Sequence, residues 1–434
     1  MTADLLAGSA QCTANAVPEA PTLHGVPDPT QITSRTDDAP RLRRVLLGYP
    51  VTTTVLFGIV ASFPLFLAGA YAVRLQEHLG ATKAQFGWAA AAYFAAGTLG
   101  SLQLGRLVDR HGSRFGGVVA AIGGFVASLF IGLATQRWWM LAIGLGITGF
   151  ANTAGQLAGN RILAASVRTE RQGIGFGAKQ SSVPFGSFLA GIVVSLLGVD
   201  VSWRATFVVY GVAALAIAVV SPEFGAAPRS EITGRKGVGR DRTALVVLGL
   251  AGAFIGATGN ALAVLVVDAF ETAGFNASVA AGTLAFGGAA AVIGRVLIGW
   301  LVDRRGSDGY AELTAIVIAG VAGFASLAVA GRSVPLLVLG VGFGFAAGWG
   351  WPAIIYLVTV RNSTAPPGTS TGFVLTGVFF GAIVGPPLFA TIAEQVSYPT
   401  AWATAAVMTA LGAIGVQISR SLSVVRRSAE ARTR

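Results

Sequence analysis

Three cationic residues lie within long apolar stretches of the sequence, where a charged side chain is costly. Arg161, Lys179 and Arg295 are each flanked by runs rich in Ala, Gly, Leu, Ile and Val. A charge at the centre of a bilayer costs roughly 2.5–3.5 kcal/mol on insertion scales, so such a residue is by default a hypothesis for function. Asp, Glu and His are absent from comparable depth in these stretches. We therefore interpret the three cations as a site for an anionic small molecule.

The three cations differ in their expected depth. Arg295 precedes Asp303, at the polar end of its run, by eight residues, which is about 12 Å along a helix. Lys179 lies six residues after Gly173, which is about 9 Å into its run, and Arg161 lies five residues before Ser166, which is about 8 Å. Arg161 could instead extend its guanidinium group to the lipid headgroups. Arg295 is the strongest candidate, followed by Lys179.

Polar and aromatic residues accompany these cations. Asn152, Gln156 and Asn160 recur at every fourth position, which places them on one face of a helix. Such a face meets either a cavity or a neighbouring helix, and both interpretations are open. The equivalent stretch in the second half of the chain, at 349–356, contains aromatic residues. These residues suit an organic anion with an apolar part, although core packing also explains the tryptophans. The candidate binding residues of this stretch are Trp349, Trp351 and Tyr356.

The residue types disfavour other chemistry. The sequence has no cluster with metal-ligand spacing, no nucleophile triad and no glycine-rich phosphate loop. Its one cysteine, Cys12, excludes an internal disulfide and a cysteine-based metal site. We expect neither an enzyme nor a bound metal or cofactor.

The elements that position these residues are apolar stretches long enough to cross a membrane. Hydrophobic residues make up 53% of the 434 positions and charged residues only 11%, with a mean hydropathy of +0.69. Because about 20 apolar residues cross the hydrocarbon core as a helix, the sequence predicts an all-α integral membrane protein with twelve transmembrane helices. The predicted spans are 46–73, 85–106, 115–134, 138–163, 173–197, 203–220, 245–268, 278–301, 311–330, 335–360, 369–394 and 400–419.

Small residues are abundant in these spans, with 59 glycines in the chain. Small residues let helix backbones approach closely in lipid. Two faces are predicted to do so, formed by Gly377, Gly381 and Gly385 and by Gly97, Ser101 and Gly105.

The net charge of +11 reflects membrane topology and does not indicate a nucleic-acid partner. When the tails and alternate loops are placed on one side, the other side keeps only a few basic residues. By the positive-inside rule, both termini are cytoplasmic. Arginine dominates the 30 basic residues, which hints at a GC-rich genome and hence a bacterial plasma membrane. The side of the membrane opposite to the termini is expected to carry only Arg74, Lys83, Arg137, Arg204 and Arg332.

Internal similarity divides the chain into two halves. An offset of 195 residues pairs Gly149-Phe150-Ala151 with Gly344-Phe345-Ala346 and aligns several further glycines. A polar stretch at 221–243 separates a six-helix bundle at 46–220 from another at 244–420. Residues 1–45 are expected to be a disordered cytoplasmic tail, not a signal peptide, and 421–434 a second cytoplasmic tail.

Two copies of a loop motif mark the repeat, GRLVDRHGSRFG at 105–116 and GWLVDRRG at 299–306. With two six-helix halves and a long middle loop, they resemble the major facilitator superfamily. The resemblance implies two pseudo-symmetric bundles that rock about a central site near the bilayer midplane. It also implies a gate, whose candidate residues are Gly105, Asp109, Arg110, Gly112, Arg114, Asp303 and Arg304.

In this family the motif's Asp, here Asp109, engages the cytoplasmic start of span eleven and stabilises the outward-facing state. A carboxylate near a helix N-terminus contributes about 0.3–1 kcal/mol. Alternatively, the arginines serve topology only, and Asp109 balances their charge. Members that complete a charge relay carry an acid after span four, where this chain reads Ser166-Val167-Arg168-Thr169.

Two stretches resemble particular branches. Residues 294–303 are similar to span eight of monocarboxylate and oxalate/formate transporters, in which an Arg at the position of Arg295 contacts the substrate carboxylate. This chain has Ala291 where monocarboxylate transporters carry an Asp. The stretch GFGAKQSSVPFG at 175–186 looks like a segment of cyanate-permease-like members.

Taken together, these features predict a secondary active transporter of a small organic anion, expected to be a carboxylate. Coupling is either to protons, carried by the substrate or by Lys179, or through anion exchange. The expected partners are the anion, the bilayer and, for symport, protons, and we expect a monomer. One alternative is a proton-driven exporter of drugs or metabolites; exporters of cationic drugs usually need an intramembrane acid. A transporter-like receptor or sensor is an alternative of another class.

Overall fold

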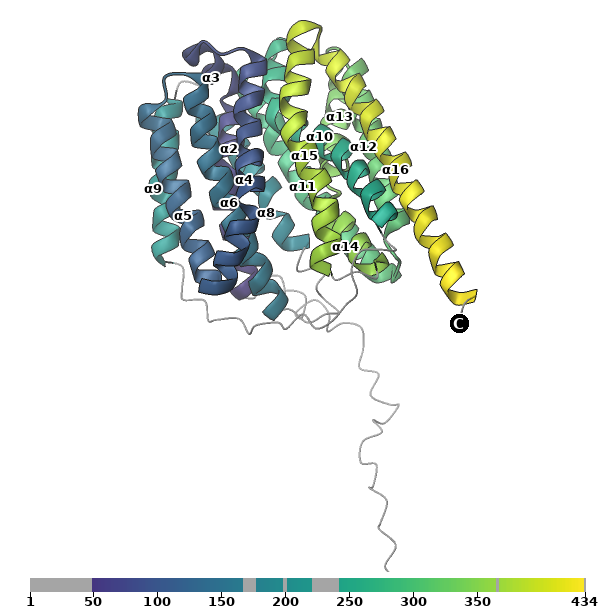
Figure 1. Cartoon of the computed structure of the whole chain (residues 1–434). Coiled ribbons are helices and arrows are strands. Elements are labelled where there is room, and N and C mark those ends of the chain that lie inside the picture. The colour runs from purple at the N-terminus through teal and green to yellow at the C-terminus, as the bar shows by residue number, and fades with distance from the viewer. Residues whose placement is uncertain (1–48, 167–176, 198–200, 221–241, 364–366, 433–434) are drawn as a thin grey trace, which may run out of the picture. The chain divides into compact units, whose positions relative to one another are not determined.

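The computed structural model describes residues 49–166, 177–197, 201–220, 242–363 and 367–432 (Figure 1). Contacts divide the chain into two units, Met1–Leu42 and Arg43–Arg434, and every described residue belongs to the second. The predicted N-terminal tail and the predicted linker up to residue 241 lie outside the described residues.

The first half of the chain forms a series of apolar helices joined by short turns. A helical turn at 177–180 precedes α8. The elements are α2 (Tyr49–Ala70), α3 (Ala72–Leu79), α4 (Lys83–His111), α5 (Ser113–Leu129), the π-helical turn η2 (Phe130–Ala134), α6 (Trp138–Ser166), α8 (Ser182–Leu197) and α9 (Trp203–Val220).

The second half repeats this pattern. Its elements are α10 (Arg242–Thr272), α11 (Ala277–Arg305), α12 (Tyr310–Val329), α13 (Val334–Ala346), α14 (Pro352–Asn362), α15 (Pro367–Gln395) and α16 (Tyr398–Arg432).

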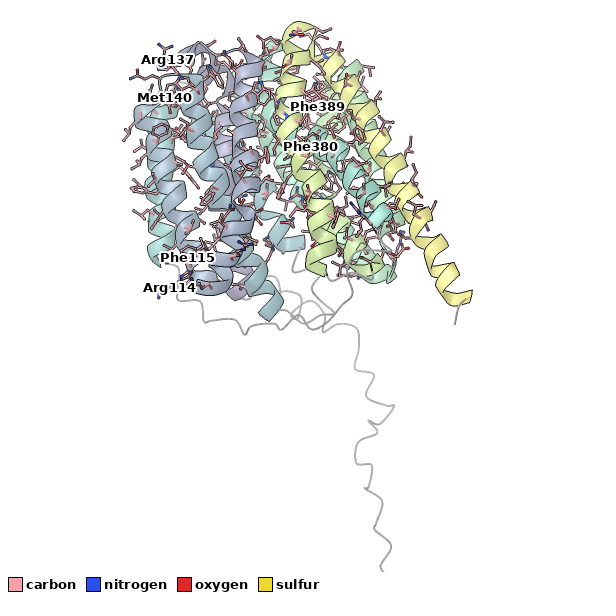
Figure 2. The ribbon with its side chains drawn as sticks, in the orientation of Figure 1. Arg114, Phe115, Arg137, Met140, Phe380 and Phe389 are labelled. Atoms are coloured by element: carbon pink, nitrogen blue, oxygen red, sulfur yellow. The ribbon has the colours of Figure 1, made fainter. Side chains whose placement is uncertain are left out.

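Across the described residues the helices group into twelve consecutive segments, one for each predicted span, and no strand occurs among them. Seven of the described helices are long and apolar enough to cross a membrane, or eight if the bent pair α2–α3 is one span. Large apolar side chains such as Phe380, which is 62% exposed, lie on the outside of the helices (Figure 2). The predicted all-α membrane architecture is confirmed.

The two halves use the same helix pairings. In the first half α2 packs on α8, α6 packs on both α4 and α5, and α5 packs on α9. In the second half α10 packs on α15, α13 packs on both α11 and α12, and α12 packs on α16. The main contacts between the halves, α8 with α11 and α4 with α15, are exchanged by the repeat. The structure therefore shows the duplication that the 195-residue offset predicts.

All three glycines of one predicted small-residue face pack closely against a neighbouring helix. A Cβ atom at Gly377, Gly381 or Gly385 would lie within 2.3 Å of a backbone oxygen of α10, so only glycine permits this contact between α10 and α15. The prediction of close packing at the second face is correct for Gly97 and wrong for Gly105. Gly97 packs closely on Gly149 of α6, whereas Gly105 faces open space.

Two predicted spans are interrupted rather than continuous. α2 and α3 meet at an angle of 69°. Residues 347–351 separate α13 from α14, and this break stands just before Pro352, which lacks the N–H that a continuous helix requires. The turn at 177–180 and α8 instead form one helix, Gly177–Leu197.

The last helix is longer than its predicted span. α16 continues to Arg432 through residues assigned to the C-terminal tail. Ser423 is buried in this extension, and its hydroxyl lies 3.3 Å from that of Tyr310. Packing against α12 therefore extends the helix beyond the end of the apolar run.

The bundle has two ends, which we call outer and inner after the orientation that the charge distribution predicts. Arg137 and Met140 mark the outer end, and Arg114 and Phe115 mark the inner end (Figure 2).

Candidate functional site

Arg295 on α11 is buried among neutral groups, with only 2% of its surface exposed. Its Nη1 donates to the carbonyl oxygen of Gln180, and its Nη2 donates to the carbonyl oxygen of Trp349 at 2.8 Å. The guanidinium carbon also lies 5.1 Å from the centre of the Trp349 ring, within the range of a cation–π contact. No carboxylate contacts Arg295 within the described part of the chain. Its positive charge is therefore hydrogen-bonded but not neutralised.

Lys179 is buried in the same way, with 3% exposure. Its Nζ donates to Oδ1 of Asn160 at 2.6 Å. Asn160 lies on α6 and is exposed, so it forms the accessible edge of this pair. Gln180 follows Lys179 directly, so one short segment carries both Lys179 and the carbonyl group that Arg295 bonds. Lys179 and Asn160 belong to the first half, and Arg295 belongs to the second.

The polar face of α6 leads to this pair. Gln156 donates through Nε2 to Oδ1 of Asn152 at 3.5 Å, one turn along the helix, and both side chains are half-buried. Asn160 continues the same face. The sequence therefore predicted correctly that these three residues are aligned, and the structure connects the last of them to Lys179.

The two predicted tryptophans have different environments. Trp349 lies at the boundary between the halves, where its ring meets Phe66 of α2 edge-on at 5.5 Å. Its Nε1 donates to Asn260 at 3.4 Å. Trp351 is instead 1% exposed within an apolar cluster of the second half, and its Nε1 donates to the Gly348 carbonyl. The ring of Trp351 therefore packs in the core of the second half, and its role in binding stays a prediction.

Tyr356 on α14 is half-buried. It packs against the same apolar cluster as Trp351. The side chain of Arg161, the third predicted cation, lies outside the described residues.

The first loop motif is described only in part. Gly112 adopts a φ of +86° between α4 and α5, a conformation that favours glycine. Arg110 and Arg114 are exposed at the inner end, and the side chain of Asp109 lies outside the described residues. A Cβ at Gly105, or at Gly372 near the start of α15, would meet nothing within 4 Å.

The second copy of the motif forms local contacts. Asp303 pairs with Arg361 of α14 at 3.3 Å, and the guanidinium group of Arg304 lies 5.1 Å from the centre of the Trp300 ring. The Asp303–Arg361 pair joins α11 to α14, so it reinforces the inner end of the second half, whereas the Arg304–Trp300 contact lies within α11.

Sequence reasoning missed a cluster at the outer end. Asp268 of α10 is 2% exposed and accepts hydrogen bonds from Lys83 of α4, the Tyr398 hydroxyl of α16 and, at 3.1 Å, the Gln76 amide of α3. Glu394 of α15 accepts from the backbone N–H of Ala84 at 2.9 Å. These bonds hold the halves together at the outer end. The predicted spans 245–268 and 369–394 end at these two acids, so the sequence placed both near that edge without pairing them.

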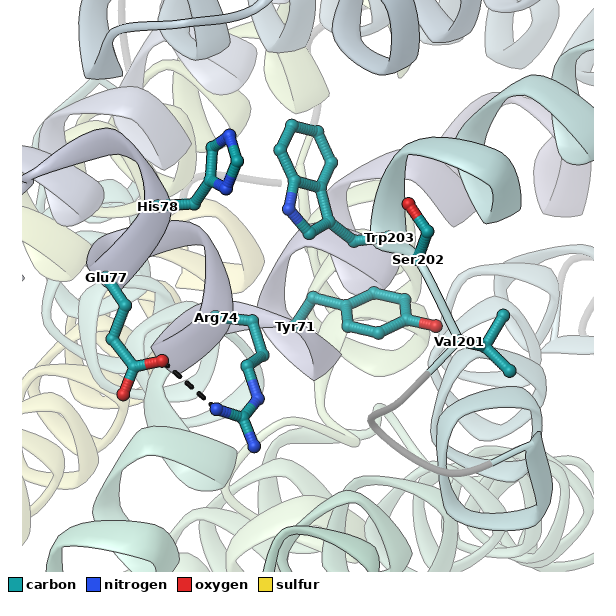
Figure 3. A pocket seen from close by; sticks show the side chains of 7 residues that line it. All are labelled: Tyr71, Arg74, Glu77, His78, Val201, Ser202 and Trp203. Carbon is teal, nitrogen blue, oxygen red and sulfur yellow. Dashed lines mark hydrogen bonds and ion pairs between the residues drawn. The ribbon is translucent and has the colours of Figure 1, made fainter.

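A separate cavity of about 340 Å³ opens at the outer end of the first half (Figure 3). Arg74 and Glu77 form an ion pair across 3.1 Å on its α3 wall. The opposite wall is the start of α9, where the ring of Trp203 meets that of His78 edge-on. Its lining shares no residue with the cluster around Arg295, so it is not the predicted site.

Comparisons with known proteins agree with this architecture. The family model of the Major Facilitator Superfamily matches residues 51–331. A bacterial homolog of the human lysosomal transporter Spinster, in an inward-facing and occupied conformation, aligns with a TM-score of 0.61 and 14% identity over 87% of this chain and 96% of that chain. A D-xylose–proton symporter aligns with a TM-score of 0.69 and 15% identity over 85% of this chain and 97% of that chain. None of the curated proteins compared with the chain matches it.

The family match identifies the chain as a multi-pass membrane transporter and not an enzyme. The chain belongs to the Major Facilitator Superfamily, because the family model matches well over half of its length. The structural similarities, at identities of about 15%, concern the fold alone. Secondary transport of a small molecule follows from the family, and the finer resemblance to monocarboxylate and cyanate-permease-like branches stays a prediction.

Proposed function

We propose that this transporter moves a small organic anion, expected to be a carboxylate, across the bacterial plasma membrane by alternating access. The observation that carries the proposal is the burial of Arg295 and Lys179 against neutral oxygens. An ionised group in a low-dielectric interior is costly unless an opposite charge compensates it. A bound carboxylate would supply that charge, and a guanidinium group can hold it with two parallel N–H bonds.

The residues around the cations fit such a substrate. Asn152, Gln156 and Asn160 would line its polar side, whereas Trp349 and Tyr356 would contact an apolar part. Arg161 stays a candidate third cation. Two coupling schemes follow from these residues, namely symport with a proton carried by the substrate or by Lys179, and exchange of one anion for another.

Uptake into proteoliposomes tests the proposal. Radiolabelled acetate, pyruvate, benzoate and oxalate are offered with and without a pH gradient, and with and without an internal anion. We expect uptake of at least one of them. Stimulation by the pH gradient indicates symport, and stimulation by the internal anion indicates exchange. The absence of any carboxylate uptake would refute the proposal.

Variants assign the uptake to the site. Arg295→Gln is expected to abolish uptake and Lys179→Gln to reduce it, because each removes one positive charge from the cluster. Arg137→Gln removes an exposed charge at the outer end and should leave uptake unchanged. Unaltered uptake by Arg295→Gln would contradict an anion site at this residue.

The same panel separates the alternative functions. D-xylose is included because a D-xylose–proton symporter shares the fold, and its uptake would indicate a sugar transporter. Efflux of organic cations from preloaded vesicles would favour the drug or metabolite exporter. Binding of a carboxylate without any flux would favour the receptor or sensor.

The proposed orientation has its own test. Cys12, the only cysteine, lies in the N-terminal tail that we expect to be cytoplasmic. A membrane-impermeant maleimide should label Cys12 only after the cells are permeabilised. Labelling of intact cells would place the tail outside.

A further inference from the structure

Asn260 of α10 is a half-buried polar residue beside the candidate site, in a stretch (255–270) whose other residues are all buried. Its Nδ2 donates to the carbonyl oxygen of Gly256 at 2.8 Å, one turn earlier in the same helix. Its Oδ1 accepts a hydrogen bond from Nε1 of Trp349 at 3.4 Å. The amide group is therefore oriented by α10 and offers its oxygen to Trp349.

Trp349 contacts Arg295 through two different groups. Its carbonyl oxygen accepts from Nη2 of Arg295 at 2.8 Å, and the centre of its ring lies 5.1 Å from the guanidinium carbon. The buried Nε of Arg295 has no hydrogen-bond partner among the described residues. The position of Trp349 therefore helps to set where the guanidinium group and its unpaired N–H point.

Trp349 itself lies in the non-helical stretch 347–351, so no regular helix fixes it. Helix α10 supports the backbone there, because a Cβ at Gly259 would lie 2.7 Å from the carbonyl oxygen of Gly348. The rings of Phe66 and Phe345 meet the Trp349 ring edge-on at 5.5 and 5.8 Å. Such apolar contacts tolerate a turn of the indole, whereas a hydrogen bond is directional. The bond to Asn260 supplies this directional contact.

We propose that Asn260 is a positioning residue of the anion site, which holds the ring of Trp349 against Arg295 through the indole N–H. The inference rests on the proposed function and adds a residue of α10 that acts on the anion only through Trp349. Without this bond the indole can turn, and the guanidinium group is held less firmly in the orientation that binds a carboxylate. A binding group that is held in place before the ligand arrives binds more tightly.

Asn260→Leu tests the proposal, because leucine has a similar size and no polar atom. We expect the KM for carboxylate uptake to rise at least about threefold, as the loss of one neutral hydrogen bond implies. The maximal rate per folded transporter should stay the same, whereas damage to the fold alone would lower the rate at constant KM. Asn260→Ala, which adds no atoms, is the second variant in case leucine does not fit.

Thr258→Val is the matched control on α10. It removes a buried hydroxyl group whose hydrogen bonds go to Ile255 and Thr409. Its KM should equal that of the wild type. The substrate in all assays is the member of the panel of acetate, pyruvate, benzoate and oxalate that has the lowest KM in the wild type.

A double-mutant cycle shows whether Asn260 acts through Trp349. Trp349→Phe keeps an aromatic ring at this position but has no N–H for Asn260. Adding Asn260→Leu to Trp349→Phe should therefore leave the KM unchanged, because the bond is already lost. Additive effects would mean that Asn260 acts on the substrate directly, and they would overturn the inference.

The transport results separate this inference from the proposed function. An unchanged KM in Asn260→Leu, together with loss of uptake in Arg295→Gln, overturns the inference and leaves the proposed function intact. If the wild type takes up no carboxylate, both fail.

A spectroscopic measurement tests the hydrogen bond without any substrate. The full-length protein is labelled with ¹⁵N at the tryptophan indoles and studied by nuclear magnetic resonance in nanodiscs. The indole signal of Trp349 is the one that is missing from Trp349→Phe. Loss of its acceptor should move this proton signal upfield in Asn260→Leu but not in Thr258→Val. An unmoved signal in Asn260→Leu overturns the inference.

Discussion

Asn160, the hydrogen-bond partner of Lys179, is neutral, and a charged residue in its place would compensate the charge of Lys179. Asn160 accepts the hydrogen bond of Lys179 without compensating its charge. Asn160→Asp would place a carboxylate at the same position and form an internal ion pair. We expect the KM for carboxylate uptake to rise at least about tenfold, which corresponds to about 1.4 kcal/mol of lost binding free energy.

A neutral substitution provides the control for this effect. Asn160→Ser keeps an oxygen acceptor without adding charge, so its KM should change much less. Equal KM values for Asn160→Asp and Asn160→Ser would mean that the charge of Lys179 does not attract the substrate.

The burial of Trp351 predicts an effect on stability rather than on transport. Trp351→Ala would leave a cavity in the apolar cluster of the second half. Large-to-small core substitutions of this kind cost about 3–5 kcal/mol of unfolding free energy. We expect a clearly lower melting temperature in detergent, with an unchanged KM for the protein that remains folded. Trp139→Ala, at a 48% exposed position, should barely alter the melting temperature.

Helix α15 provides a matched pair of glycines at the scale of the element. A Cβ at Gly381 would lie 2.0 Å from the carbonyl oxygen of Ala253, whereas a Cβ at Gly372 would meet nothing within 4 Å. Gly381→Ala must push α15 away from α10 and should cost about 1–3 kcal/mol, the usual range for overpacking. Gly372→Ala should be neutral or stabilising by up to about 1 kcal/mol, because alanine is the better helix former.

Melting temperatures of the two variants in detergent show whether close helix packing or the helix propensity of alanine determines the effect of each substitution. Equal melting temperatures would show that the close approach of α10 and α15 does not limit stability.

We expect the contacts between the halves at the outer end to control the opening of the whole molecule at that end. Asp268 and Lys83 join α10 to α4, and hydrogen bonds to charged groups contribute about 1.5–3 kcal/mol each. Asp268→Asn should weaken this closure and expose residues between α4 and α15. Ala390, which is fully buried there and packs near Gly87, is a suitable reporter.

A cysteine at Ala390 can be labelled selectively once Cys12 is replaced by serine. We expect an impermeant maleimide to react with Ala390→Cys at least about fivefold faster in the Asp268→Asn background, a factor that corresponds to about 1 kcal/mol. Val396→Cys, at a 67% exposed position, should react equally fast in both backgrounds. An unchanged rate at Ala390→Cys would show that Asp268 does not hold the outer end closed.

The sequence by itself determined the features that the bilayer imposes locally. A membrane helix must be apolar over a fixed length and must satisfy its own backbone, so composition alone predicts the number and order of the segments. The depth of Arg295 and Lys179, the absence of acids near them and the glycine face of α15 follow from the same local constraints. The repeat predicted two equivalent halves, which the shared helix pairings show.

Tertiary structure alone decided which residues meet. Arg295 bonds Gln180 and Trp349, which are 115 and 54 residues away, and Asp268 bonds Lys83 across 185 residues. Trp349 and Trp351 are two residues apart in a non-helical stretch, so helical periodicity could not show that Trp349 contacts Arg295. Hydropathy records the exposure of each segment to lipid, but the pairing of polar groups depends on how whole helices pack against one another.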